Sequence, residues 1–221
     1  MFDDISDHYD FLNHFLSFGI DRKWRNKLVG LLATYHPDDI LDVATGTGDL
    51  AISLSTLEPR KIIGIDISDK MLEVGRRKIS ESGLEKKITF RSGDAEKIPF
   101  SDQTFDAITV AFGVRNFEDL SLGLREMKRV LRPGGIMMIL EFSQPSSFPM
   151  KQAYHFYSRF FIPLIGRKVS RHPEAYQYLP DSVAKFPSGK NFLDILSGLG
   201  LRNLRHYRLS MGIASIYMAE K

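Results

Sequence analysis

The sequence has no cysteine among its 221 residues. Disulfide bonds, thiolate nucleophiles and cysteine-ligated metal centres are therefore excluded. It also lacks any run that approaches the ~20 consecutive apolar residues of a membrane-spanning helix. Its start, MFDD, is acidic and is not typical of a signal peptide. We therefore expect a cytoplasmic protein, with any contact to the inner face of the membrane being peripheral.

Three further features that the sequence lacks limit the classes of function that can be expected. The formal net charge is only +3, which gives no reason to expect nucleic acid as a partner. The six histidines show no metal-binding spacing, so no metal site is expected. No internal repeat or low-complexity linker divides the chain. A chain of this length can bury one substantial core, and we expect a single domain over residues 1–221.

What is present is an alternation of apolar strands with helices. Strands are expected at residues 40–44, 61–67, 88–92, 105–110, 136–140, 201–209 and 213–219, and helices at 49–55, 68–83, 119–131 and 191–199. This order predicts an α/β fold with a mostly parallel seven-stranded sheet and helices on both faces. The last strand alternates apolar and polar residues, as an antiparallel edge strand often does.

Two segments stand outside this pattern. Residues 1–36 carry apolar side chains at helical spacing and are expected to form an N-terminal helical cap, with Asp21 capping its second helix. Residues 144–190 are rich in aromatic, proline and basic residues, and we interpret them as an inserted helical substrate cap. Aromatic and basic side chains mix over residues 148–171, which is typical of a membrane interface or of a tunnel wall for an apolar tail. Packing of these aromatics onto the core is an equal alternative.

The loop after the first strand, DVATGTGD, is the first element of a nucleoside site. Gly46 and Gly48 there allow positive φ angles and a close approach of a ligand to the backbone. Asp66 ends the second strand and can accept hydrogen bonds from both ribose hydroxyls. Asp94 and Ala95 follow the third strand, where a carboxylate and a backbone N–H can bind adenine. All lie at carboxyl ends of strands, where such sheets bind ligands.

The residues of this loop help to decide whether the cofactor is a dinucleotide or S-adenosylmethionine. A dinucleotide usually needs Gly-x-Gly-x-x-Gly, but Ala51 stands where the third glycine would be. Asp42 and Asp49 would repel a pyrophosphate and attract the cationic sulfonium and amino group of S-adenosylmethionine. S-Adenosylmethionine is therefore favoured, and an NAD-binding oxidoreductase is the alternative.

Four stretches of the chain resemble known methyltransferases. Residues 41–50, LDVATGTGDL, look like the first motif of class I methyltransferases, which have a Rossmann-like fold. Residues 2–25, residues 112–116 (FGVRN) and residues 131–143 (LRPGG leading to LEFS) are similar to the quinone C-methyltransferases of menaquinone and ubiquinone biosynthesis. This resemblance runs nearly end to end.

The resemblance implies four contacts with S-adenosylmethionine, at Thr47, Asp66, Asp94 and Ala95. The chain departs from the family pattern at Ala111. Some relatives have a serine at this position, so the side-chain contact that the serine would make is lost in this chain. Members also often have a longer segment before the Phe-Asp of residues 2–3, so the chain resembles a short-headed version.

The implied reaction methylates a ring carbon of a polyprenyl quinol, first of all demethylmenaquinol to menaquinol. Such a carbon becomes nucleophilic when a ring hydroxyl loses its proton, so the site needs a base and a group that stabilises the ring oxyanion. We expect Arg115 to be the stabiliser, Asn116 to orient the ring and Tyr9 to donate a hydrogen bond. Glu141 is expected at the cleft, as a base or as a partner of Arg115. A structural salt bridge for Arg115 and a core position for Tyr9 are the alternatives.

Other functions stay open at this stage. The acceptor could be the benzoquinol of the ubiquinone pathway, or one enzyme could serve both pathways. A silent scaffold that binds S-adenosylmethionine in a quinone-synthesis complex is an alternative of another class. Self-association into a homodimer is a further prediction.

Overall fold

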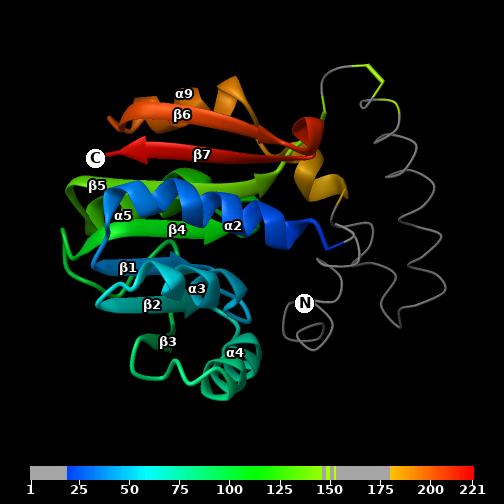
Figure 1. The fold of residues 1–221 in the computed structure, drawn as a ribbon. Helices are drawn as coiled ribbons and strands as arrows, with labels where there is room; N and C mark the ends of the chain where they lie inside the picture. The colour runs from blue at the N-terminus through cyan, green and yellow to red at the C-terminus, as the bar shows by residue number, and fades with distance from the viewer. Residues whose placement is uncertain (1–18, 146–147, 150–151, 153–179) are drawn as a thin grey trace.

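The structure is a computed structural model that describes residues 19–145, 148–149, 152 and 180–221. Its centre is a seven-stranded sheet with the order β3-β2-β1-β4-β5-β7-β6 (Figure 1). The strands are β1 (Asp39–Val43), β2 (Lys61–Asp66), β3 (Ile88–Ser92), β4 (Phe105–Ala111), β5 (Leu131–Phe142), β6 (Arg202–Leu209) and β7 (Ala214–Glu220). Neighbouring strands from β3 to β5 are parallel, and β7 is antiparallel to both of its neighbours. The predicted α/β fold and seven-stranded sheet are confirmed.

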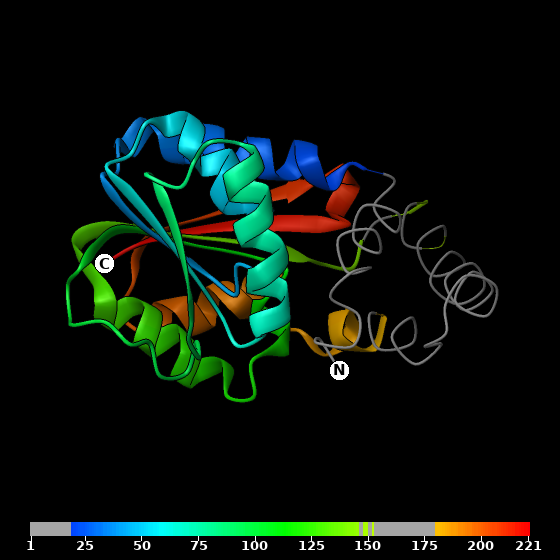
Figure 2. The same cartoon turned by 90° about the horizontal axis from the view of Figure 1, so that it is seen from below.

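Helices cover both faces of this sheet, as Figure 2 shows edge-on. The helices α2 (Asp21–Leu32), α3 (Asp49–Leu54) and α4 (Asp69–Glu81) share one core cluster, while α5 (Leu120–Val130) and α9 (Lys190–Gly198) share the other. Successive residues of β1 alternate between the clusters: Ile40 belongs to the first and Leu41 to the second, and both are fully buried. The two-sided burial explains why the central strands are almost continuously apolar.

Two of the predicted helices begin with an ordinary capping side chain. The Ser68 hydroxyl accepts a hydrogen bond from the N–H of Met71 at 3.3 Å and begins α4, and the Asp119 carboxylate caps α5. The prediction that Asp21 caps α2 is wrong. Ile20 occupies the cap position, and Asp21 is fully buried with its carboxylate on Arg25.

The prediction that the last strand lies at an edge is also wrong. β7 lies between β5 and β6, and every residue from Ala214 to Ala219 is buried. Its polar side chains suggested exposure, but they are hydrogen-bonded inside the protein. Ser215 Oγ lies 3.0 Å from Ser143 Oγ, and the Tyr217 hydroxyl accepts from the N–H of Gly189 at 2.7 Å. The edge strand is β6, whose side chains are exposed or half-buried.

The strand β5 begins five residues earlier than predicted. Its pairing with β4 jumps from Phe105 opposite Leu131 to Ala107 opposite Ile136, so the residues between form a bulge within the strand. Gly134, with φ +76°, belongs to this bulge. The Arg-Pro-Gly-Gly stretch is therefore an irregularity of β5 and not a turn before it.

The predicted caps are described only in part. Residues 1–18 and most of 144–190 lie outside the described residues, whereas residues 180–185 are helical. The helix α2 packs on the sheet through Trp24, Leu28 and Leu32. No helix in the described part of the chain is long and apolar enough to cross a membrane.

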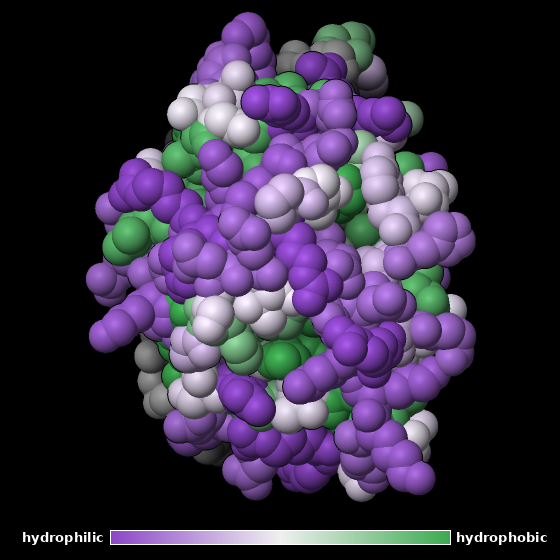
Figure 3. Space-filling view, turned by 90° about the vertical axis from the view of Figure 1, so that its left-hand side faces the viewer, coloured by the Kyte–Doolittle hydropathy of each residue, from purple (hydrophilic) through white to green (hydrophobic). Residues whose placement is uncertain are grey.

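The two ends of the parallel strands differ in character. Hydrophilic side chains predominate at the amino end (Figure 3). Arg132 there pairs with Asp106 and Asp39, and Arg60 pairs with Asp39. These ion pairs occupy the amino ends of the strands, whereas open α/β sheets bind ligands beyond the carboxyl ends of their strands.

Candidate active site

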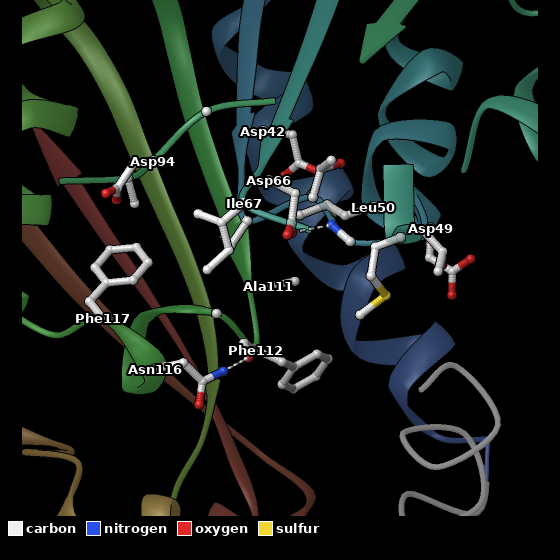
Figure 4. Close-up of a pocket in the computed structure, with 18 of the residues that line it drawn as sticks. Asp42, Asp49, Leu50, Asp66, Ile67, Asp94, Ala111, Phe112, Asn116 and Phe117 are labelled. Atoms are coloured by element: carbon white, nitrogen blue, oxygen red, sulfur yellow. Dashed lines mark hydrogen bonds between the residues drawn. The ribbon is translucent and has the colours of Figure 1, made fainter. Parts of the chain in front are cut away.

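A cavity of about 360 Å³ lies at the carboxyl ends of β1, β2, β3 and β4. The loop after β1, the first residues after β2 and β3, and the segment after β4 form its wall (Figure 4). Six of its lining side chains are carboxylic acids, namely Asp42, Asp49, Asp66, Asp94, Glu96 and Glu118. One described lining side chain is basic, Arg25 from α2. The wall is therefore suited to a cationic ligand.

The loop after β1 is held close to the sheet by an aromatic ring. Gly48 has φ +85°, and a Cβ there would lie 2.7 Å from Cε2 of Phe90, closer than atoms can approach. The same ring from β3 fills the space that Cβ atoms of Gly64 and Gly75 would need. Gly46, with φ +57°, lines the cavity directly. The two glycines predicted for the cofactor loop therefore differ, because Gly46 faces the ligand space while Gly48 makes room for Phe90.

Asp66 ties the cofactor loop to the end of β2. Its Oδ2 accepts a hydrogen bond from the N–H of Gly46 at 2.8 Å, and its Oδ1 accepts from the N–H of Ser68 at 3.0 Å. The carboxylate is half-buried and lines the cavity. It is thus fixed at the strand end where the sequence predicts a ribose.

Asp42 is a buried acid in the cavity wall, only 1% exposed. Its two carboxylate oxygens accept hydrogen bonds from Thr45 Oγ1 at 2.6 Å and from Thr109 Oγ1 at 2.7 Å. Burial raises the pKa of Asp42 to about 6, with the nearby negative charge of Asp66 as a smaller cause, while the two hydroxyls oppose the rise. A cation that entered the cavity would favour the ionised form.

The other predicted cofactor residues also reach the cavity. Asp94 and Ala95 line it after β3, and Asp94 Oδ1 accepts a hydrogen bond from the N–H of Glu96 at 2.8 Å. Thr47 lines it from the loop, where its hydroxyl accepts from Lys78 Nζ at 2.8 Å. All seven predicted cofactor residues therefore gather at one place, six of them in the wall and Gly48 behind it.

The predicted catalytic residues divide between the cavity wall and the layer behind it. Asn116, at the end of a 3-10 turn (Val114–Asn116), lines the cavity. Arg115 and Glu141 are not among the described lining residues, which corrects the expectation that Glu141 faces the cleft. Arg115 Nη1 lies 2.6 Å from Glu141 Oε1 and donates to the carbonyl oxygen of Phe112 at 2.5 Å. Tyr9 lies outside the described residues.

The Arg115–Glu141 ion pair is almost completely enclosed. The Arg115 side chain is 3% exposed and that of Glu141 is fully buried. The guanidinium also lies over the ring of Phe142, 5.4 Å from its centroid. The backbone N–H of Arg115 donates to Glu141 Oε2 at 3.2 Å. This pair therefore holds the segment after β4 against β5.

Arg25 lines the cavity but was not among the site residues predicted from the sequence. It lies within the N-terminal block that carries the family resemblance, but no local pattern connects α2 with the cofactor loop. The structure shows the connection, because Arg25 Nη2 lies 3.0 Å from Asp49 Oδ2.

Known proteins that are similar to this chain over its whole length are methyltransferases. The sequence model of the ubiE/COQ5 methyltransferase family matches residues 1–221. A demethylmenaquinone methyltransferase of Bacteroides fragilis is 48% identical over 222 residues, which cover 100% of the chain and 91% of that relative. The ubiquinone/menaquinone biosynthesis C-methyltransferase UbiE of Geotalea daltonii is 48% identical over 223 residues, covering 100% of the chain and 94% of that relative.

Solved structures share the fold. A SAM-dependent methyltransferase from Thermotoga maritima superposes with a TM-score of 0.69 over 100% of both chains at 18% identity. A SAM-dependent methyltransferase from Methanococcus maripaludis gives 0.68 at 17% identity, covering 99% of the chain and 93% of the neighbour. The predicted Rossmann-like class I methyltransferase fold is confirmed.

Proposed function

This chain belongs to the ubiE/COQ5 methyltransferase family, whose members use S-adenosylmethionine, and from that premise we propose that it methylates a ring carbon of a demethylated polyprenyl quinol. The first acceptor to test is demethylmenaquinol, because relatives that are 45–48% identical over the whole chain are demethylmenaquinone methyltransferases. The observation that carries the proposal is the acidic cavity with a glycine loop at the carboxyl ends of β1 to β4.

The residues present fit S-adenosylmethionine. When bound, this molecule supplies a methyl group on a positively charged sulfur. Asp66 would bind the ribose hydroxyls, and Asp94 with the N–H of Ala95 would bind adenine. Asp42 would balance positive charge from inside the wall. Thr47 and Gly46 would border the methionine part, since both line the loop after β1.

The acceptor side of the site is proposed to be the segment after β4. Asn116 lines the cavity and can donate its amide N–H to a ring oxygen of the quinol. Arg115 is a positioning residue in this proposal: its guanidinium donates to the carbonyl oxygen of Phe112 and pairs with Glu141, and it would act on the ring oxyanion by fixing the segment that carries Asn116. Glu141 holds Arg115 in place. Tyr9 stays a candidate donor to the ring, and the base that removes the hydroxyl proton could be a water molecule.

The test is methyl transfer from labelled S-adenosylmethionine to a short-tailed demethylmenaquinol, with a demethylated benzoquinol assayed in parallel. The expected result is label on the naphthoquinol. The Asp66→Ala variant is the control, because it should lose transfer together with donor binding. Failure of the wild-type protein to label either quinol, despite measured donor binding, would refute the proposed acceptor.

A second acceptor has specific support. The Geotalea daltonii relative is named for both ubiquinone and menaquinone biosynthesis and is as similar as the Bacteroides fragilis relative. Label on both quinols in the same assay would therefore assign both reactions to this chain. Label on the benzoquinol alone would assign the ubiquinone reaction.

We further propose that the protein meets its substrate at a membrane surface, because a polyprenyl tail partitions into the bilayer. Peripheral contact would then come from the aromatic and basic residues of 148–171, most of which lie outside the described residues. Cosedimentation with anionic vesicles tests this contact, and sedimentation velocity tests the predicted homodimer.

A further inference from the structure

The charges around the cavity are distributed unevenly. Six carboxylic acids line it, and Arg25 is the one basic side chain among the described lining residues. S-Adenosylmethionine carries two positive groups and one negative group, the α-carboxylate. Among the described lining side chains Arg25 is the one that attracts a carboxylate, and Lys78, whose Nζ lies 2.9 Å from Asp49 Oδ1, adds positive charge at the same end of the cavity. The part of the wall beside Arg25 is therefore the place where the α-carboxylate of the donor is expected to bind.

Arg25 is held rigidly in this position. Its Nη2 donates to Asp21 Oδ2 at 2.7 Å and to Asp49 Oδ2 at 3.0 Å. Its side chain is 7% exposed and Asp21 is fully buried, so the guanidinium has little freedom to move. Within the described part of the chain the guanidinium bonds through Nη2 only, which leaves the donors of Nε and Nη1 for a ligand. A guanidinium with two free donor groups suits a carboxylate.

The position of Arg25 also agrees with the orientation expected for S-adenosylmethionine in the cavity. Figure 4 shows Asp94 and Asp49 at opposite ends of the view, with Asp66 between them. Arg25 lies at the Asp49 end, to which it is bonded. With adenine at Asp94 and ribose at Asp66, the methionine part extends toward Arg25.

We propose that Arg25 binds the α-carboxylate of S-adenosylmethionine and thereby makes the site selective for donors that carry this carboxylate. This inference rests on the donor position proposed above. It gives the helix α2 a role in ligand binding in addition to its packing on the sheet.

The test compares two ligands that differ only in this group, S-adenosylhomocysteine and its decarboxylated form, by isothermal titration calorimetry. Neither ligand requires turnover. The wild-type protein should bind S-adenosylhomocysteine more tightly. Arg25→Gln should weaken S-adenosylhomocysteine binding roughly 10- to 100-fold, as expected for loss of charged hydrogen bonds, and should leave the affinity for the decarboxylated ligand within about twofold.

Two further variants keep the test decisive. Arg25→Gln leaves the buried Asp21 without its arginine, so the double variant Asp21→Asn/Arg25→Gln, which removes both charges, is measured as well. Arg60→Gln is the matched control, because it removes an ion-paired arginine at the opposite end of the sheet. It should change neither affinity.

The outcomes separate the inference from the function on which it rests. Loss of affinity for the carboxylate ligand alone supports the inference. Equal loss for both ligands, or no loss for either, in a folded variant overturns it and gives Arg25 a purely structural role. Failure of the wild-type protein to bind either ligand overturns the proposed donor site itself.

Discussion

The buried carboxyl of Asp42 should make the ligand-free protein less stable as the pH rises. Its pKa is about 6 in the folded protein, raised from 3.8 chiefly by burial. Between these values the unfolded chain releases the proton while the folded protein keeps it. Deprotonation therefore favours the unfolded state, and the free energy of unfolding falls as the pH rises through this window.

The size of the effect follows from the two pKa values. Each pKa unit corresponds to about 1.4 kcal/mol. The rise from 3.8 to about 6 therefore removes about 3 kcal/mol of unfolding free energy once the pH is above both values. Other carboxyls oppose this trend. The hydrogen bond from Arg129 lowers the pKa of Glu126, whose contribution is lost as the pH falls. The pH dependence of the unfolding free energy of the wild-type protein is therefore the sum of several contributions and does not isolate that of Asp42.

The Asp42→Asn variant isolates the contribution of one residue. Asparagine cannot ionise, and its loss of a hydrogen bond from Thr45 or Thr109 is independent of pH. Urea unfolding of both proteins from about pH 3.5 to about pH 7.5 gives the difference in unfolding free energy, which should move in favour of the variant by about 3 kcal/mol. A difference that stays constant, or that moves in favour of the wild type, would falsify the buried-acid account.

Four further predictions concern the site. The affinity for S-adenosylmethionine should rise roughly tenfold from pH 5 to pH 7 as Asp42 ionises, and a calorimetric profile as flat as that of Asp42→Asn would remove Asp42 from the surroundings of the cation. Asp66→Ala should weaken donor binding at least about tenfold; unchanged affinity by calorimetry would exclude the ribose role. Gly48→Ala should cost about 2 kcal/mol or more in thermal unfolding, with part regained in Gly48→Ala/Phe90→Leu, because the added Cβ meets the Phe90 ring. No loss would contradict that contact. Arg115→Ala should keep donor affinity and lose most turnover, and an active variant would exclude Arg115 from the mechanism.

Local sequence patterns predicted the elements that position the site. The strand before the glycine loop, the aspartate that ends β2 and the helix predicted from residue 68 each depend on neighbours along the chain. Their positions at one end of the sheet follow from parallel pairing, since carboxyl ends of parallel strands meet at the same edge. Apart from Arg25, the residues that meet on the cofactor side of the site could therefore be predicted from the sequence.

Contacts between distant segments decided what could not be predicted. The ring of Phe90 fits against three glycines, Gly48, Gly64 and Gly75, which lie in different segments of the chain. The edge assignment of β7 failed because the hydrogen-bond partners of Ser215 and Tyr217 lie far away in the chain. Asp21 resembled a helix cap because its true partner cannot be recognised before the burial of α2 is known.

The case of Arg115 shows why two neighbouring residues need separate tests. The sequence predicted that Arg115 and Glu141 belong together but not the direction in which they point. Phe112, with φ +60°, turns the chain directly after β4, and Arg115 folds back onto β5 while Asn116 reaches the cavity. Removal of Asn116 should therefore reduce acceptor turnover without loosening the segment, whereas removal of Arg115 leaves Glu141 buried without its arginine and should also lower stability. Thermal unfolding of Asn116→Ala and Arg115→Ala, measured with turnover, separates these effects, and equal losses of stability would show that both residues only support the fold.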